Sequence, residues 1–211
     1  FSSIHAIKWL FINMSYFSKL LFLLVLLAFD QSLSLPPCKD NFKTACFGTV
    51  VHQNGEKYVG EIKNFKYHGN GTYLFLNGNV YEGEFMNGIQ NGNGVFTFAN
   101  GDVYKGQFKD GLYHGNGVSL FSDGEKYEGE YELDLPHGKG TQTFVSGDIY
   151  VGDFKDGSLN GSGVFTYANG DKYEGEFKNN LFNGEGIFTF SDGKTQIGQF
   201  KDHKFIGEPK Q

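Results

Sequence analysis

Arginine is absent from the sequence: all 18 basic residues among the 211 are lysines. Arginine is the residue that grips phosphate and carboxylate groups through paired hydrogen bonds. Its absence, together with a formal net charge of −6, argues against nucleic acid and against an anionic membrane surface as main partners. Proline is scarce (4 residues), whereas glycine (31 residues) and aromatic residues (17%) are abundant. A chain so rich in rings is not a disordered linker, so we expect the glycines to mark a turn-rich folded structure.

Residues 1–34 differ in composition from the rest of the chain. Lys19 precedes the apolar run Leu20–Phe29, and small residues at Ser32 and Ser34 follow it. This layout predicts a secretory signal peptide over residues 14–34, cleaved after Ser34. The alternative is an uncleaved anchor that reaches back into residues 7–17, although the apolar run is short of the roughly 20 residues that a membrane helix needs. We expect Met14 to be the natural start and residues 1–13 to be upstream translation or a fragment edge.

Only two cysteines occur, Cys38 and Cys46, both just after the expected cleavage site. In an exported protein, an even number of nearby cysteines indicates a disulfide. We therefore expect Cys38 and Cys46 to close a small loop at the N-terminal edge of the mature chain, within a segment (35–57) that also holds a half repeat. An acylated Cys38 of the lipoprotein type is the alternative, although prolines precede it where small residues are expected.

A 23-residue repeat runs through most of the remaining chain. Its first mark is a tyrosine followed two residues later by glycine: Tyr58/Gly60, Tyr81/Gly83, Tyr104/Gly106, Tyr127/Gly129, Tyr150/Gly152 and Tyr173/Gly175. Its second mark is a G-x-G pair: Gly69/Gly71, Gly92/Gly94, Gly115/Gly117, Gly138/Gly140, Gly161/Gly163 and Gly184/Gly186. We call the six complete copies units 1 to 6, which are 58–80, 81–103, 104–126, 127–149, 150–172 and 173–195. A degenerate unit, 196–211, follows and is expected to cap the array.

Within a unit the side chains alternate as they do in β-strands. Tyr173, Gly175 and Phe177 fall on one side of the segment YEGEFK, and the charged residues between them fall on the other. Every unit ends in Asn-Gly, Asp-Gly or Ser-Gly, which are tight-turn signals. The pattern predicts an all-β fold: an elongated, single-layer antiparallel sheet of repeated β-hairpins, preceded by a signal-peptide helix. Glycine would leave space over the backbone for a neighbouring ring, and burial of that ring would offset the cost of glycine in a strand.

The pattern Y-x-G-x-[F/Y], then G-x-G, then glycine seven residues further on, closely resembles the MORN repeat (membrane occupation and recognition nexus). The resemblance covers about 150 of the 177 residues that follow the expected cleavage site. It implies an elongated, twisted sheet of hairpins, a role in scaffolding, dimerisation or lipid contact, and no catalysis by the repeats themselves.

Polar residues that could carry chemistry follow the repeat. His68, His114 and His137 occupy one position of three units, and asparagine occupies it in the other three. We interpret them as turn residues rather than zinc ligands, because adjacent copies would lie about 10 Å apart. Carboxylates also form rows, with Glu61, Glu84, Glu130, Asp153 and Glu176 at one position, which favours a solvated face over a cation or sugar site. We therefore expect no enzyme activity, no cofactor and no metal.

One row of side chains could contact a partner. We place it in the hairpin loops before each G-x-G pair, where it comprises Tyr67, Ile89, Leu112, Tyr113, Leu135, Leu159, Leu181, Phe182 and Phe205. These side chains either tuck under their own hairpins or form a contact stripe for a protein or a second copy. The open terminal strand is another possible contact. We thus expect an exported scaffold of the periplasm, cell envelope or cell exterior that binds a protein or itself; the alternative is a module that binds lipid or cell-wall glycan.

Overall fold

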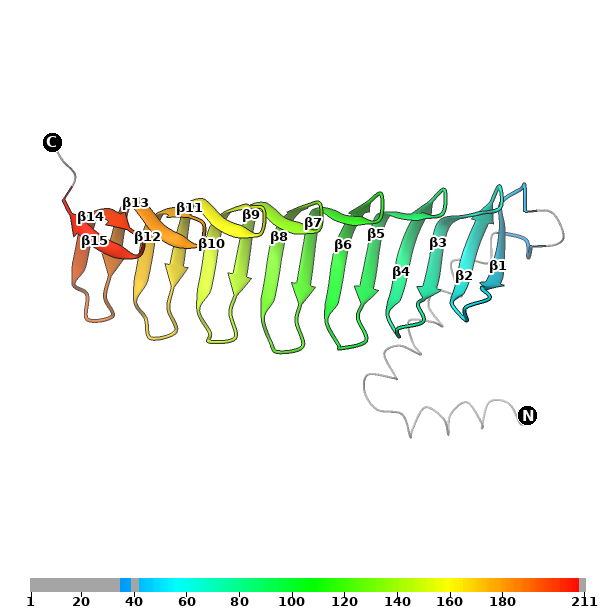
Figure 1. Ribbon diagram of the computed structural model, residues 1–211, viewed down its shortest axis with the longest axis horizontal. Coiled ribbons are helices and arrows are strands. Elements are labelled where there is room, and N and C mark those ends of the chain that lie inside the picture. The colour runs from blue at the N-terminus through cyan, green and yellow to red at the C-terminus, as the bar shows by residue number, and fades with distance from the viewer. Residues whose placement is uncertain (1–34, 39–41, 209–211) are drawn as a thin grey trace, which may run out of the picture.

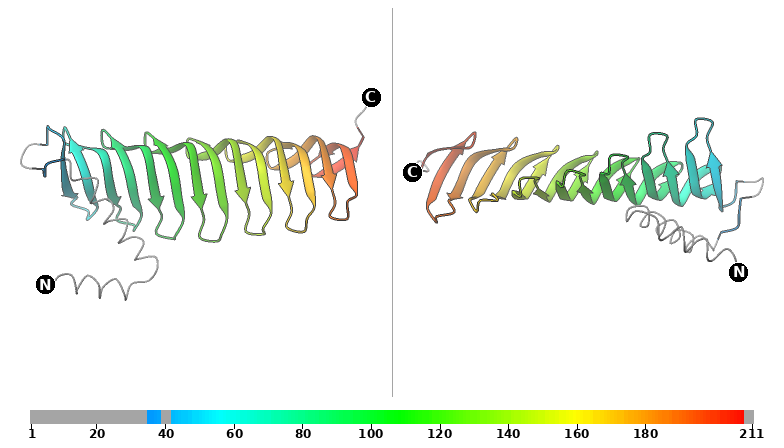
Figure 2. Two further views of the ribbon diagram at one scale, coloured as in Figure 1. Left: turned by 180° about the vertical axis from the view of Figure 1, so that it is seen from behind. Right: turned by 90° about the horizontal axis from the view of Figure 1, so that it is seen from below.

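The computed structural model describes residues 35–38 and 42–208. They form one 15-stranded antiparallel sheet in which every strand lies beside its neighbours in sequence, from β1 to β15. The sheet is a long twisted rod, with β1 at one end and β15 at the other (Figures 1 and 2). The expected all-β sheet of hairpins is confirmed. The expected signal peptide and its helix lie outside the described residues. The strands are β1(Cys46–Val51), β2(Lys57–Lys63), β3(Lys66–Leu74), β4(Val80–Met86), β5(Ile89–Thr97), β6(Val103–Lys109), β7(Leu112–Leu120), β8(Lys126–Glu132), β9(Leu135–Thr143), β10(Ile149–Lys155), β11(Ser158–Thr166), β12(Lys172–Lys178), β13(Leu181–Thr189), β14(Thr195–Lys201) and β15(Lys204–Gly207).

Each unit is a hairpin of one seven-residue strand and one nine-residue strand, such as β4 and β5 in unit 2. The two strands are joined by a two-residue turn with positive φ at both positions, as at Asn87 (55°) and Gly88 (95°). This is the type I′ geometry that matches the twist of a hairpin. The Asn-Gly pairs that end the units, such as Asn77-Gly78, lie instead in the longer loops between hairpins. The sequence signal for a turn at the end of each unit was correct, but the tighter two-residue turn is the one in mid-unit, where we expected a loop.

Neighbouring hairpins are tied together at both ends. At the two-residue turns, the amide of Gly88 donates to the carbonyl oxygen of Tyr67 in the preceding unit (2.8 Å), and the same bond recurs along the rod. At the long loops, a carboxylate of one unit accepts from a backbone amide of the next. Asp102 binds the amide of Ser122, and Asp171 binds that of Ser191, both at 2.8 Å. These bonds fix each hairpin relative to its neighbours, as expected of a repeat array stabilised by nearest-neighbour contacts.

A β-bulge interrupts each hairpin next to the G-x-G pair. In unit 2, Gly83 pairs with Gly94 but Phe85 pairs with Gln90, so that three residues on β5 face Glu84 alone. The bulge leaves the amide of Asn93 without a ladder partner, and the Glu84 side chain accepts its hydrogen bond at 2.8 Å. Equivalent bonds are made by Glu61, Gln107, Glu130 and Asp153.

The core is a file of tyrosine rings lying over glycine backbone. Tyr81 is fully buried, and its hydroxyl donates to the carbonyl oxygen of Glu84 at 2.9 Å. The ring lies over the facing glycines Gly83 and Gly94: a Cβ added to Gly94 would lie 2.5 Å from the Tyr81 oxygen. The expectation that glycines make room for rings is confirmed. The sheet curls so that this face lines a trough along the rod, and we call it the inner face. The six tyrosines of this file are Tyr58, Tyr81, Tyr104, Tyr127, Tyr150 and Tyr173.

The glycines of the repeat divide into two sets with different roles, although the sequence pattern presents each G-x-G pair as a single mark. In the first set, the glycine after each tyrosine faces the second glycine of the G-x-G pair, and a Cβ added to any of them would lie 2.4 to 2.6 Å from its nearest neighbour. These facing pairs are Gly60 and Gly71, Gly83 and Gly94, Gly106 and Gly117, Gly129 and Gly140, Gly152 and Gly163, and Gly175 and Gly186.

The second set is the first glycine of each G-x-G pair, which lies in the bulge. All six of these residues have positive φ, between 54° and 110°, a conformation that glycine adopts more readily than other residues. They are Gly69, Gly92, Gly115, Gly138, Gly161 and Gly184. Within its own hairpin, only the second glycine of each pair lies opposite the glycine that follows the tyrosine. The first glycine pairs instead with an aromatic residue of the next strand, as Gly92 does with Phe108.

The two ends of the sheet differ. At the N-terminal end a disulfide joins Cys38 to Cys46, which confirms the expected pairing. Residues 36–38 run beside β1, where the amide of Cys38 donates to Phe47 and the amide of Phe47 donates to Pro36. At the C-terminal end, β15 has four residues and pairs with β14. Among the described residues, nothing covers the far edge of β15.

Candidate functional site

The nine residues of the expected partner stripe lie in strands rather than in loops, so that placement is wrong. They also belong to two faces, because adjacent residues of a strand point in opposite directions. Tyr67, Tyr113, Leu159, Phe182 and Phe205 belong to the buried or half-buried inner face, where Tyr113 stacks on Tyr104 with ring centroids 3.6 Å apart. Ile89, Leu112, Leu135 and Leu181 face outward, and Ile89 and Leu135 are 48% and 45% exposed.

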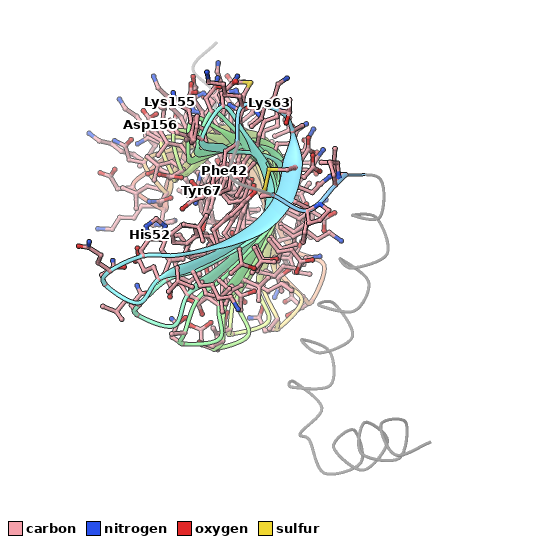
Figure 3. All side chains as sticks on the ribbon, turned by 90° about the vertical axis from the view of Figure 1, so that its right-hand side faces the viewer. Phe42, His52, Lys63, Tyr67, Lys155 and Asp156 are labelled. Carbon is pink, nitrogen blue, oxygen red and sulfur yellow. A yellow bond between two sulfur atoms is a disulfide. The ribbon has the colours of Figure 1, made fainter. Side chains whose placement is uncertain are left out.

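Tyr67, one of the inner-face residues, is labelled in the view along the rod (Figure 3). Tyr67 and Phe42 lie within the curve of the sheet. Tyr67 stacks on Tyr58, with centroids 3.8 Å apart, and its hydroxyl bonds the ring of His52. Five of the nine residues therefore complete the core, and four face outward, of which Leu181 is half-buried. Whether those four contact a partner stays a prediction.

The outer face carries a feature that the sequence analysis did not identify. Paired residues on adjacent strands form one line across β9–β14, which consists of Thr141, Val151, Val164, Glu174, Ile187 and Ile197. Beside it lies bare backbone at Gly140, Gly152, Gly163, Gly175, Gly186 and Gly198, and together they line a groove of about 990 Å³. We call this the outer groove. The sequence signal for it was the apolar residue after Tyr150 and at Ile197, at a position where units 2, 3, 4 and 6 carry charge and unit 1 carries Val59.

The repeat glycines of the N-terminal half do not take part in this groove. Of the facing glycine pairs, the lining includes only those from Gly140 onward. The glycines of the pairs that lie outside it are Gly60, Gly71, Gly83, Gly94, Gly106, Gly117 and Gly129. Their environment assigns them to packing under the tyrosine rings, and it gives them no separate binding role.

Toward the N-terminal end of the rod, the line of residues that borders the outer groove alternates between charged residues and Thr72, Val95 and Val118. On β4, β6 and β8 the same line holds Glu82, Lys105 and Glu128, whereas β10 and β14 hold Val151 and Ile197, which are 51% and 56% exposed. Exposed aliphatic side chains therefore lie close together over units 5 and 6 and the start of the degenerate unit. Contiguous exposed apolar patches on a soluble protein often mark an interface.

Charges around the outer groove are predominantly negative. The two nearby lysines are held in ion pairs, Lys139 with Asp153 (2.5 Å) and Lys172 with Glu174 (2.9 Å). Glu176 and Glu185 also line the groove, and the described part of the chain offers neither of them an ion pair. The groove therefore presents uncompensated carboxylates beside apolar side chains.

The other polar rows have structural roles. The carboxylates expected to form a solvated face include Glu61, Glu84, Glu130 and Asp153, which hold the bulge amides described above. The three histidines His68, His114 and His137 lie in strands, and the positive φ angles belong to the glycines that follow them. The turn interpretation of these histidines is therefore wrong. In residues 35–38 and 42–208 there is no group of three or more His, Cys, Asp or Glu residues that could hold a metal ion.

The buried tyrosines are not candidates for acid–base chemistry. Burial raises the pKa of Tyr173 to about 12, above the ordinary value of about 10, and it raises the pKa of Tyr81 as well. Their hydroxyls are thus protonated donors to backbone oxygen at physiological pH. Within the described ranges, no helix has the length and hydropathy needed to cross a membrane.

Comparison with known families gives a match along most of the rod. The MORN repeat model matches residues 58–80, 81–103, 104–126, 127–149, 150–172 and 173–195. No curated protein matches the sequence significantly.

Several solved structures are similar in part. The TCP domain of Drosophila melanogaster SAS-4 (dCPAP), in complex with a proline-rich motif of Ana2, is 16% identical, with 78% of this chain and 94% of that chain covered and a TM-score of 0.42. The G-box domain of the microcephaly protein CPAP is 16% identical over 75% of this chain and 100% of that chain, with a TM-score of 0.34. Virginiamycin B lyase from Staphylococcus aureus is 9% identical over 76% and 71%, with a TM-score of 0.20. Likenesses this remote carry no information about the partners or activity of this chain.

Proposed function

The chain belongs to the MORN repeat family, and we propose that it is a non-catalytic scaffold, exported to the cell envelope or exterior, that binds another protein along the outer groove. The observation that carries this proposal is the aliphatic line of Val151, Val164, Ile187 and Ile197, of which all but the half-buried Val164 are exposed, on a sheet that has no second layer. Covering these side chains would remove apolar surface from water, at about 25 cal/mol per Å².

Charge favours a different protein over a second copy of this chain. Two copies that met through the outer groove would bring Glu176 and Glu185 close to the same residues of the other chain, and like charges in an interface are costly. A partner with apolar and basic side chains would instead pair with these carboxylates. The same carboxylates disfavour an anionic lipid head group.

Export is proposed on two grounds. Disulfides persist in oxidising compartments, and Cys38 is paired with Cys46 in this fold. Residues 14–34 also have the layout of a signal peptide. Neither ground names the compartment, so periplasm, envelope and exterior are one proposal, to be tested by fractionation of cells that express the full chain.

The binding surface can be tested by site-specific photo-crosslinking in the native cell. A photoreactive amino acid at Ile187 should yield a defined heterologous adduct, and the same amino acid at Val95, which holds the corresponding outer-face position of unit 2, should not. An Ile187→Asp/Ile197→Asp variant should lose the adduct when the crosslinker is placed at Val164, whereas Val95→Asp should keep it. Equal labelling from Ile187 and Val95 would overturn the assignment of the outer groove.

Size-exclusion chromatography with light scattering distinguishes the alternative occupant. We expect the purified wild-type chain to be monomeric. A dimer that Ile187→Asp/Ile197→Asp converts to a monomer would identify the groove as a self-association surface and would contradict the charge argument.

A further inference from the structure

A row of aromatic rings on the inner face is interrupted in units 3 and 4. At the penultimate position of the second strand, units 1, 2, 5 and 6 carry Tyr73, Phe96, Phe165 and Phe188. Each ring contacts the aromatic ring two residues later in its own unit, with centroids 4.6 to 4.8 Å apart. Units 3 and 4 carry Ser119 and Gln142 instead.

The missing rings leave a pocket of about 300 Å³, which we call the inner pocket. Its floor is polar: the Ser119 hydroxyl hydrogen bonds the Tyr131 hydroxyl (2.5 Å), and the Gln142 amide donates to Glu125 (2.6 Å). Tyr131 is itself a departure, because this position holds Ile62 in unit 1 and phenylalanine in the other units. The replacements at Ser119 and Tyr131 thus fit each other, and they exchange a ring contact for hydroxyl groups.

One aromatic ring at the rim of the inner pocket is left without a ring partner. Phe121 is 42% exposed, and among residues 42–208 no other ring packs against it. Its counterparts Phe98 and Tyr167 each pack on the ring two residues earlier. The face of Phe121 is therefore free to receive a ligand.

Every charged side chain that lines the inner pocket is a carboxylate. Asp102 and Glu125 lie at the long-loop end, and Asp134 lies at the two-residue turn of unit 4. No basic residue lines the pocket, and the described residues provide none of the three carboxylates with an ion pair. The Asp102 carboxylate accepts hydrogen bonds from the Ser122 amide and the Asn100 side chain. These bonds hold the carboxylate in position at the rim of the pocket.

We propose that the inner pocket binds an organic ammonium group, which lies against the face of Phe121 and beside the carboxylate of Glu125. An ammonium ion is attracted to the face of an aromatic ring within about 6 Å, and the carboxylates supply the opposite charge. Anionic ligands are excluded by the same groups. The group could belong to a small amine or to a lysine side chain of a protein. This site lies on the opposite face from the outer groove, so the two proposals can fail independently.

Departures from the repeat gather around the same pocket. Unit 4 has Leu133 at the first turn position, with φ 51°, where the other six turns have asparagine or aspartate. It also has Pro136 at the position where units 1, 3 and 6 and the degenerate unit have rings. Violations of local preference that a repeat otherwise keeps tend to cluster at functional sites.

The test is an NMR titration of the full-length protein with choline, in which the chemical shifts of the aromatic side chains are followed. We expect saturable shifts at Phe121 and Tyr131, and weaker binding as salt is raised, because the carboxylates are near the surface. The control ligand is 3,3-dimethyl-1-butanol, the neutral isostere of choline, which should give no saturable shift. Equal binding of the two ligands would reduce the pocket to an apolar cleft and overturn the proposal, as would no binding of either choline or Nα-acetyl-lysine amide.

Three variants locate the site. Phe121→Leu and Glu125→Gln should each weaken choline binding by about two- to fivefold, the range for an exposed cation–π contact or ion pair. The double variant Ser119→Phe/Tyr131→Phe rebuilds the ring packing of unit 2 and should abolish binding while raising or keeping the melting temperature. Phe144→Leu is the matched control, since that ring packs on Phe165 (5.6 Å); it should bind choline as wild type does. Wild-type affinity in the double variant would rule out the inner pocket.

The relative affinity for the two probes identifies the source of the ammonium group. Preference for choline would indicate a methylated head group, and preference for Nα-acetyl-lysine amide would indicate a lysine side chain.

Discussion

Substitution of Gly94 by alanine tests whether the tyrosine rings need bare glycine backbone beneath them. We expect this substitution to lower the free energy of unfolding, whereas replacing a strand glycine usually raises it. Gly94 does not have a positive φ, so replacing glycine there would ordinarily stabilise a strand by about 0.5–1 kcal/mol. Here the new Cβ would lie 2.5 to 2.7 Å from the Tyr81 ring. That ring is held by its hydrogen bond to Glu84 (2.9 Å) and by edge contacts with Phe85 and Phe108. Overpacking of this kind costs about 1–3 kcal/mol, so we expect a net loss of about 1–2 kcal/mol.

The assay is urea unfolding followed by circular dichroism, combined with hydrogen exchange of β4 and β5, because repeat arrays can unfold in parts. The control is Gly101→Ala in the same unit. Gly101 has a positive φ (96°) and its Cβ would make only an ordinary contact, 3.6 Å from Ser122, so its cost of about 1–2 kcal/mol comes from the backbone alone. In a Tyr81→Leu background the cost of Gly94→Ala should fall by about 1 kcal/mol or more, whereas that of Gly101→Ala should not change. A neutral or stabilising Gly94→Ala, or equal costs in both backgrounds, would refute the reasoning.

Three further predictions concern the turns and the ends. Leu133→Asn should stabilise the protein by about 0.5–1 kcal/mol, since asparagine tolerates positive φ better than leucine; a lower urea midpoint would contradict this. The amide of Ser191 lowers the pKa of Asp171, so this bond stabilises the fold above the unfolded pKa of about 4 and is lost as the pH falls through the lower folded value. As the pH is lowered from about 6 to about 2, the melting temperature should then fall less steeply for Asp171→Asn than for wild type. Parallel curves of melting temperature against pH would contradict the assignment. Reduction of Cys38–Cys46 should cost about 2.5 kcal/mol by the loop-entropy estimate and raise hydrogen exchange in β1 but not in β8; uniform acceleration along the rod would argue against a local effect.

Much of the fold could be predicted from the sequence because the same local pattern of tyrosine, glycine and turn residues occurs in six units. One Tyr-x-Gly pair is weak evidence, but six copies in phase determine which face is inward, and the ring-over-glycine packing followed from that. The bulge could not be predicted in the same way. The bulge adds residues to one strand without changing the 23-residue period, so the sequence around Gly92 has the pattern of a regular strand. The role of Glu84 as acceptor for the Asn93 amide could therefore not be predicted. The histidines were misread for the same reason, since the unusual φ belongs to the next residue.

The candidate surfaces were harder to predict, since they depend on which neighbours a side chain meets across the sheet. Tyr113 and Leu112 are adjacent in sequence and both apolar, yet one stacks on Tyr104 and the other is exposed. The expected partner stripe placed both residues of such a pair on one surface. It did so because the residues were expected in loops, where adjacent side chains need not point to opposite faces. Val151 and Ile197 looked like ordinary strand residues until the pairing placed them on one line with Val164 and Ile187.

Specific function in this chain is therefore to be sought where the units differ from one another. Residues common to all units, such as the buried tyrosines and the glycines that they cover, are required to build any hairpin of the array, so they carry no information about one particular partner. The differences fall into two sets: Ser119, Tyr131 and Gln142 open the inner face at units 3 and 4, and Val151 and Ile197 make the outer face apolar in the C-terminal half. The first set removes burial that the neighbouring units obtain from rings, and the second exposes aliphatic surface to water. Both changes cost stability in the isolated chain, and a bound ligand or partner would recover it.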